Sequence, residues 1–181
     1  WKPISDDERA VILEDDLELS PLWFTWLKKA WNTYGGRSDL GGISLCRQRM
    51  RASDSQHIMV DRDEPFLYRL PGSFGFSPNA RYWRQFINWV RTTDVQHADL
   101  YVPGTITSDW YRKSPDFWEQ VWIWWSWSNG RSLYTLYAHS RNGALIGHWA
   151  EPGVHADADN EAGLARNDEL LQSMEPLLEA F

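Results

Sequence analysis

The chain has 181 residues and a formal net charge of −7, with 43% hydrophobic and 24% charged residues. This is enough for one domain with a hydrophobic core, and the usage is that of an ordinary globular protein. The negative charge argues against a general nucleic-acid binder, the single cysteine excludes an internal disulfide framework, and no apolar run is long enough to span a membrane.

The first predicted element is a strand over residues 9–14 that ends in a cluster of carboxylates. The apolar run Ala10–Leu13 is typical of a strand covered on both faces, and Glu14, Asp15 and Asp16 follow it. Open α/β sheets bind ligands beyond the carboxyl ends of their strands. Adjacent carboxylates repel one another, and a hard divalent cation is well suited to compensate them. The alternative is a solvated acidic turn that precedes a helix.

An amphipathic helix is predicted next, over residues 21–34. Ser20 is a good N-cap, Pro21 suits the first helical position, and Gly35 with Gly36 marks the end. Apolar residues recur at helical spacing, whereas Lys28 and Lys29 are expected in solvent.

The whole segment 9–27 resembles the surroundings of the metal motif in GT-A-fold glycosyltransferases. The shared pattern is a hydrophobic strand, Glu-Asp-Asp-Leu-Glu, a small residue, proline and an aromatic helix. It is most similar to the N-acetylglucosaminyltransferase type that builds complex N-glycans and to its O-mannose relatives. The resemblance implies an α/β fold, a partial GT-A-like and Rossmann-related mixed sheet flanked by amphipathic helices. It also implies that the protein acts in the secretory pathway, in the Golgi lumen.

The same resemblance implies a cofactor and a set of ligands. Asp16 and a late histidine, His148, are expected to hold Mn²⁺ or Mg²⁺, and Glu14 and Asp15 to face a nucleotide-sugar donor, most simply a UDP-sugar. The acceptor would be a glycan or glycoprotein. Few residues precede the motif, so most of the nucleotide-binding half is expected to be missing. Another chain would have to supply it, or the isolated region would be inactive.

Shorter elements are predicted in the middle of the chain. Strands are expected over residues 43–46, 57–60 and 65–68, with Cys46 as a buried thiol in the first. Arg47, Arg49 and Arg51 form a small basic cluster, which is either an exposed face or a phosphate contact. The Ser77–Pro78 pair predicts a helix start like that at Ser20–Pro21.

Tryptophan is unusually abundant, with 13 residues. Those at helical core spacing are expected to pack against a sheet: Trp23, Trp26, Trp31, Trp83 and Trp89. A helix beginning at Ser114–Pro115 carries the aromatic run 117–127, which cannot all face one stripe. Such a helix is deeply buried, or it presents aromatic rings to a sugar or to another chain.

A strand is predicted over residues 133–137, followed by a histidine-containing stretch and an acidic tail. We therefore divide the chain into a catalytic region, residues 1–155, and a tail with a short helix, residues 156–181. His148 and His155 could instead be hydrogen-bonded loop or core histidines, because their spacing matches no known zinc motif.

Three acidic residues are candidates for a catalytic base: Glu119, Asp116 and Asp109. In the resembled enzymes a glycine-containing loop and then an acidic segment follow the metal motif along the chain. In this chain Leu70–Phe76 and Glu119 follow the motif in the same order. This chain has Glu119–Gln120 where the relatives have paired aspartates. An inverting transfer requires such a base to deprotonate the acceptor hydroxyl.

The sequence therefore favours a metal-dependent inverting glycosyltransferase region that transfers a hexosyl or N-acetylhexosaminyl group. The alternative is a non-catalytic, Trp-rich carbohydrate-binding or structural subunit derived from the same fold.

Overall fold

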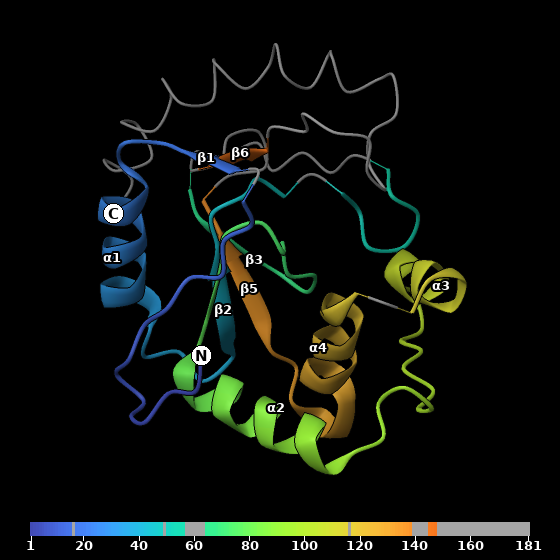
Figure 1. The fold of residues 1–181 in the computed structure, drawn as a ribbon. Coiled ribbons are helices and arrows are strands. Elements are labelled where there is room, and N and C mark those ends of the chain that lie inside the picture. Colours follow the sequence, from blue (N-terminus) through green and yellow to red (C-terminus); the bar gives the residue numbers. More distant parts are fainter. Residues whose placement is uncertain (16, 49, 57–63, 116, 139–144, 148–181) are drawn as a thin grey trace.

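A mixed four-stranded sheet forms the centre of the computed structural model, which describes residues 1–15, 17–48, 50–56, 64–115, 117–138 and 145–147 (Figure 1). The strand order is β3 (Phe66–Tyr68), β5 (Tyr134–Tyr137), β2 (Leu40–Ser44) and β4 (Phe76–Pro78). Strands β2 and β5 are parallel, whereas β3 and β4 are antiparallel to their neighbours. The predicted α/β class with a mixed sheet is confirmed.

A second, two-stranded antiparallel sheet lies apart from the first. It pairs β1 (Leu17–Leu19) with β6 (Leu145–Gly147), near the top of Figure 1. Four helices complete the described fold: α1 (Trp23–Tyr34), α2 (Ala80–Thr92), α3 (Ile106–Lys113) and α4 (Trp118–Trp127). No helix among these residues is long and apolar enough to cross a membrane.

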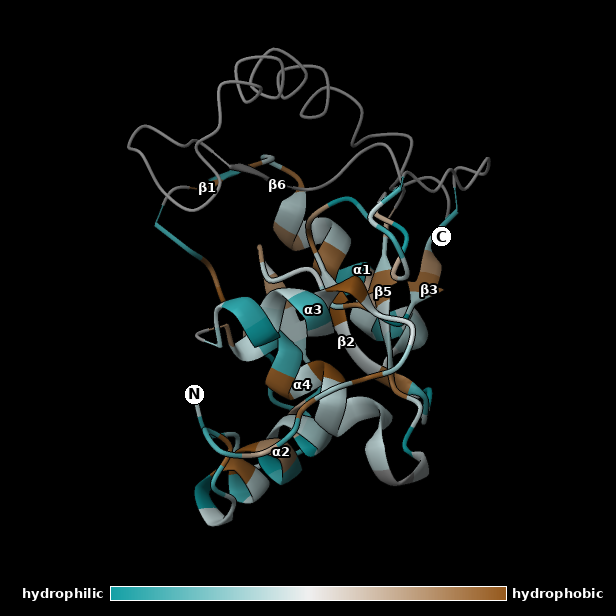
Figure 2. Cartoon of the chain, turned by 90° about the vertical axis from the view of Figure 1, so that its right-hand side faces the viewer, coloured by the Kyte–Doolittle hydropathy of each residue, from teal (hydrophilic) through white to brown (hydrophobic). Residues whose placement is uncertain are grey.

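The two faces of the central sheet are covered by different helices, as Figure 1 shows. On one face, α1 packs Trp26 and Trp31 against residues of β2 and β5, including Ile43. On the other face, α2 and α4 form an aromatic cluster with Phe76 of β4. In Figure 2, α2 alternates hydrophilic and hydrophobic positions along its length, as expected of a helix with one buried face.

Helix α1 agrees with the prediction except at its start. The Trp23 N–H donates to the Ser20 carbonyl at 3.0 Å, so a turn precedes the helix and Pro21 lies outside it. At the other end, the Gly35 N–H donates to the Trp31 carbonyl at 2.9 Å. A Cβ at Gly35 would lie 2.4 Å from that carbonyl oxygen, which explains why glycine follows the helix.

Both of the other predicted Ser-Pro helix starts are wrong. Ser77 and Pro78 belong to β4, and α2 begins after Asn79, whose side chain accepts from the Arg81 N–H at 3.1 Å. A residue that precedes proline is biased toward extended backbone, which suits Ser77 in a strand. Helix α4 begins at Trp118 rather than at Ser114–Pro115. Helix α3 was not predicted.

The remaining strand predictions have mixed outcomes. Strands 65–68 and 133–137 are confirmed as β3 and β5, and 43–46 corresponds to β2, which begins earlier. Within β2, a Cβ at Gly42 would lie 2.5 Å from the Phe76 ring, so glycine permits the close approach of β4. The predicted strand 9–14 is wrong as a regular strand: it is reduced to an isolated antiparallel bridge between Ile12 and Phe76. The predicted strand 57–60 lies outside the described residues.

The aromatic run of α4 lies in the core. Trp122 and Trp125 are 2% and 1% exposed, and Phe86 of α2 contacts their rings at centroid distances of 5.0 and 5.6 Å. Trp118 and Trp124 are half-buried and pack against the same cluster. The rings of Trp122 and Trp125 are therefore occupied by internal packing and are not available to a sugar. Of the five tryptophans expected in the core, Trp26, Trp31 and Trp83 are buried, whereas Trp23 and Trp89 are half-buried.

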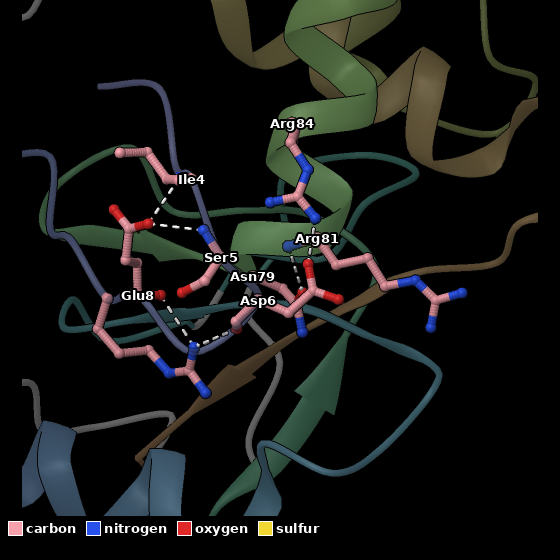
Figure 3. Close-up of polar contacts among 8 residues, drawn as sticks. Ile4, Ser5, Asp6, Glu8, Asn79, Arg81 and Arg84 are labelled. Atoms are coloured by element: carbon pink, nitrogen blue, oxygen red, sulfur yellow. Dashed lines mark hydrogen bonds and ion pairs between the residues drawn. The ribbon is translucent and has the colours of Figure 1, made fainter.

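Polar contacts within the N-terminal segment and with α2 hold this segment in place (Figure 3). Asp6 forms an ion pair with Arg84 of α2. Glu8 accepts the backbone N–H groups of Ile4 and Ser5 at 2.6 and 2.7 Å, which lowers the pKa of its carboxyl group. The Arg9 guanidinium lies 4.6 Å from the centre of the Trp31 ring.

Candidate functional site

The acidic segment emerges at the carboxyl end of the central sheet. The register joins Ile12 to Phe76, Phe76 to Ser44, and Ser44 to Tyr137, so these four residues form one row across the strands. Ser44 and Tyr137 are the last residues of the parallel strands β2 and β5. Because Ile12 is antiparallel to β4 and β4 is antiparallel to β2, the segment after Ile12 continues in the direction of the β2 carboxyl end. This is the edge where open α/β sheets bind ligands.

The carboxylates of this segment lie in solvent. Glu14 and Asp15 are exposed, and Leu13 before them is 41% exposed. Both carboxylate side chains are hard oxygen donors of the type that Mg²⁺ and Mn²⁺ prefer, so their chemistry fits a divalent cation. Asp16, the predicted metal ligand, lies outside the described residues.

The small sheet brings two distant parts of the chain to this motif. In β1 and β6, Leu17 is paired with Gly147 and Leu19 with Leu145. The pair is antiparallel, so the beginning of β1 and the end of β6 lie at the same end of the small sheet. In the sequence, Asp16 precedes Leu17 and His148 follows Gly147. His148, like His155, lies outside the described residues.

Within the part of the chain that the structure describes, no three Asp, Glu, His or Cys side chains are grouped closely enough to hold a metal ion. The predicted metal pair was Asp16 and His148, and neither residue belongs to that part. The metal site therefore stays a prediction.

The proline-glycine loop, residues 70–75, is fastened to the carboxyl ends of β2 and β5. The Tyr137 hydroxyl donates to the Leu70 carbonyl at 2.7 Å, and the Ser44 hydroxyl donates to the Gly72 carbonyl at 3.2 Å. A Cβ at Gly72 would lie 2.1 Å from Cys46 Sγ and 2.7 Å from Ser44 Oγ. Glycine is therefore required sterically for this loop to approach the sheet.

Helix α4 presents its N-terminal end to the same edge of the sheet. A short connection joins the end of α4 to β5, so the helix and the strand are antiparallel and the first turn of α4 lies toward the β5 carboxyl end (Figure 1). Glu119 is in that first turn. Its side chain is half-buried, and its Oε2 atom is buried with no hydrogen-bond partner among the described residues. An unpartnered buried carboxylate oxygen is available to accept a proton.

The two other base candidates are placed differently or not at all. Asp109 is exposed in the first turn of α3. Asp116 lies outside the described residues. Glu119 is therefore the better placed candidate for the base, because its side chain is half-buried whereas that of Asp109 is exposed.

Gln120, next to Glu119, holds the start of α4 in place. It is fully buried, and its Nε2 donates to the Leu100 carbonyl at 2.7 Å and to Ser108 Oγ of α3 at 2.9 Å. Ser108 in turn accepts the Val102 N–H at 2.9 Å. This network ties α3, α4 and the preceding loop together, and it positions the helix turn that carries Glu119.

The basic cluster is only partly available to a phosphate. Arg51 donates to both carboxylate oxygens of Asp54, with Nε at 2.7 Å from Oδ1, and to Gln56 at 2.7 Å. The hydrogen bonds from Arg51 lower the pKa of Asp54. These contacts agree with the alternative of an exposed face, in which Arg51 is paired with neighbouring residues. Arg47 is half-buried, and Arg49 lies outside the described residues.

Two protonated groups lie beneath the proline-glycine loop. Burial raises the pKa of the Cys46 thiol to about 11, and a hydrogen bond with Ser44 at 3.0 Å acts in the opposite direction. Burial also raises the pKa of the Tyr137 hydroxyl well above its ordinary value. Cys46 is half-buried rather than fully enclosed, a partial correction to the prediction. At neutral pH it is a protonated structural thiol.

Sequence reasoning missed Ser44, Gln120 and Tyr137 as residues that shape this site. Ser44 is the polar residue within the apolar run Ile43–Cys46, and Tyr137 is the last residue of the predicted strand 133–137; these positions are the signals that could have found them. Gln120 could have been noticed as the single amide within an aromatic helix. Ser108, a partner of Gln120, lies 12 residues away along the chain, and Leu70, a partner of Tyr137, lies 67 residues away, which local pattern does not reveal.

Comparison with protein-family models and with curated proteins finds no match for this sequence.

Proposed function

We propose that this chain is the metal- and acceptor-binding region of an inverting glycosyltransferase. It would transfer a sugar from a nucleotide-sugar, with UDP as the simplest carrier, to a hydroxyl group of a glycan or glycoprotein. The observation that carries the proposal is the row Ile12, Phe76, Ser44 and Tyr137, because it directs the Glu-Asp-Asp segment to the ligand-binding edge of an α/β sheet.

A divalent cation suits the acidic side of this edge. We assign Asp16 and His148 as its protein ligands, and Glu14 and Asp15 as groups that face the cation and the donor. The register of β1 with β6 supports the pairing, because it places Leu17 opposite Gly147, the residues that adjoin Asp16 and His148 in the sequence. When bound, Mn²⁺ or Mg²⁺ would neutralise the charge of the diphosphate leaving group.

Glu119 suits the role of the base. Its Oε2, which has no hydrogen-bond partner in the part of the chain that the structure describes, lies in the first turn of α4, at the same edge of the sheet. In the proposed step, Glu119 takes the proton of the acceptor hydroxyl, the acceptor oxygen bonds to the anomeric carbon, and the bond from that carbon to the diphosphate oxygen breaks. Gln120 maintains the position of the base through Ser108 and the Leu100 carbonyl.

Cation binding can be tested without assaying transfer. We expect Mn²⁺ with UDP to raise the melting temperature, by about 5–11 °C at a hundredfold excess over the dissociation constant for a protein of this size. Asp16→Asn should remove most of the shift. Asp7→Asn makes the same change of charge at an exposed residue outside the motif and should retain it. A shift that is absent from the wild type, or equal in both variants, contradicts the metal assignment.

The base can be tested separately once transfer is measured. Glu119→Gln should lower kcat by about 10²- to 10⁴-fold while the Mn²⁺ and UDP shift stays unchanged. Glu64→Gln, at an exposed carboxylate, is the control and should remain fully active. Full activity of Glu119→Gln would exclude Glu119 as the base and leave the cation site standing.

A further inference from the structure

The segment Ala10–Leu13 forms one border of the central sheet. It adjoins β4 through the bridge from Ile12 to Phe76, with the Ile12 N–H donating to the Phe76 carbonyl at 2.8 Å. The Ala10 carbonyl also faces β4, because it accepts the Ser77 hydroxyl at 2.6 Å. We call the opposite side of this segment the open edge.

Backbone alternation shows which groups face the open edge. In an extended segment the backbone groups of successive residues point to opposite sides. Ala10 and Ile12 point to β4, so the N–H and C=O groups of Val11 and Leu13 point outward. Among the described residues, none of these four groups has a hydrogen-bond partner. This is the donor and acceptor spacing that another strand recognises.

The side chains of the segment resemble those of an internal strand. Val11 packs against the α1 cluster on one face of the sheet, and Ile12 packs against the α2 and α4 cluster on the other. Strands covered on both faces are apolar, whereas natural edge strands carry charges or proline that prevent further pairing. The four residues Ala10–Leu13 include neither, and Leu13 is 41% exposed.

We propose that the open edge binds an extended, apolar β-strand of a different protein, which continues the sheet beyond Ala10–Leu13. The occupant is a strand because the exposed groups are main-chain donors and acceptors at strand spacing, and main-chain pairing supplies the affinity in such additions. It is apolar at its centre because both faces next to it are hydrophobic. This inference does not depend on the proposed glycosyltransferase activity.

The first measurement is amide hydrogen exchange on the 181-residue chain. The Ile12 amide should be protected, whereas the Val11 and Leu13 amides should exchange at least tenfold faster. The second measurement supplies a strand: four valines flanked by threonines, fused before Trp1 through a 16-residue Gly/Ser linker with a span of about 22 Å. In this fusion the exchange of Val11 and Leu13 should slow at least tenfold. A fusion with serines in place of the valines is the control.

A pair of variants isolates the main-chain contribution. Leu13→Pro removes the outward N–H and should abolish the protection of Val11 in the fusion, whereas Leu13→Ala keeps the N–H and should retain it. Protection of Ile12 in both variants shows that the fold is intact. If Val11 and Leu13 are as protected as Ile12 in the unfused chain, or stay unprotected in the valine fusion, the proposal is wrong. Protection that rises with protein concentration would identify a second copy as the occupant and would also overturn it.

Discussion

Gly72→Ala tests whether the proline-glycine loop depends on close contact with the sheet. The new Cβ would lie 2.1 Å from Cys46 Sγ and 2.7 Å from Ser44 Oγ, so the loop or both side chains must move. Overpacking of this kind costs about 1–3 kcal/mol. Movement of the loop would also lengthen the hydrogen bond from Ser44 to the Gly72 carbonyl, which contributes about 1 kcal/mol. We therefore expect a loss of about 3 kcal/mol in the free energy of unfolding.

Urea unfolding gives the measurement. With an m-value of about 2 kcal/mol/M, a loss of this size lowers the midpoint by about 1.5 M. Cys46→Ala removes the sulfur that the Cβ would meet, so the cost of Gly72→Ala should fall by about 1 kcal/mol or more in that background. Gly36→Ala, which has no atom within 4 Å of its new Cβ, should change the stability by less than about 0.5 kcal/mol. An equal cost of Gly72→Ala in both backgrounds would refute the steric explanation.

Two further predictions concern protonation and helix capping. Burial raises the pKa of Cys46 to about 11 from an unfolded value of 9.0. The protonated thiol therefore contributes fully to the free energy of unfolding below pH 9, and this contribution is lost as the pH rises through 11. Between pH 8 and 11, Cys46→Ala should therefore lose about 2 kcal/mol less unfolding free energy than the wild type in urea titrations; equal losses would contradict the burial of the thiol. Asn79→Ala removes the cap of α2 and should cost about 1 kcal/mol, measured by thermal or urea unfolding. Asn88→Ala, at an exposed position of the same helix, should be nearly neutral, and an equal cost for both would mean that capping is not the cause.

Several parts of the candidate site could be predicted from residue patterns. The apolar run before Glu14 predicted that the carboxylates follow a sheet segment; the structure reduces that segment to one bridge at Ile12, and Glu14 and Asp15 follow it in solvent. The spacing of Trp26, Ala30 and Trp31 predicted the buried face of α1, because helical periodicity is a property of neighbouring residues. Glu119 was predicted from the resemblance, but its place in the first turn of α4 was not, because the helix was expected to begin at Ser114–Pro115.

Other parts could not be predicted, because they depend on contacts between distant segments. Ser77–Pro78 has the same dipeptide as Ser20–Pro21, yet it forms a strand in which Ser77 accepts the Trp31 indole N–H at 2.9 Å and donates to the Ala10 carbonyl. The isolated bridge of Ile12 likewise depends on which segment lies on its other side. Local propensity is weak compared with such tertiary contacts.

The sequence by itself determined the class of the fold, the buried face of α1 and the chemical character of the acidic segment, because these follow from periodicity and side-chain chemistry over a few residues. Only the tertiary structure decided that Ile12, Phe76, Ser44 and Tyr137 form one row, that Gly72 must lie against Cys46, and that Gln120 holds the turn of Glu119. These pairings join surfaces far apart along the chain. Their choice depends on how well the surfaces fit when the core closes, and no local pattern encodes that fit.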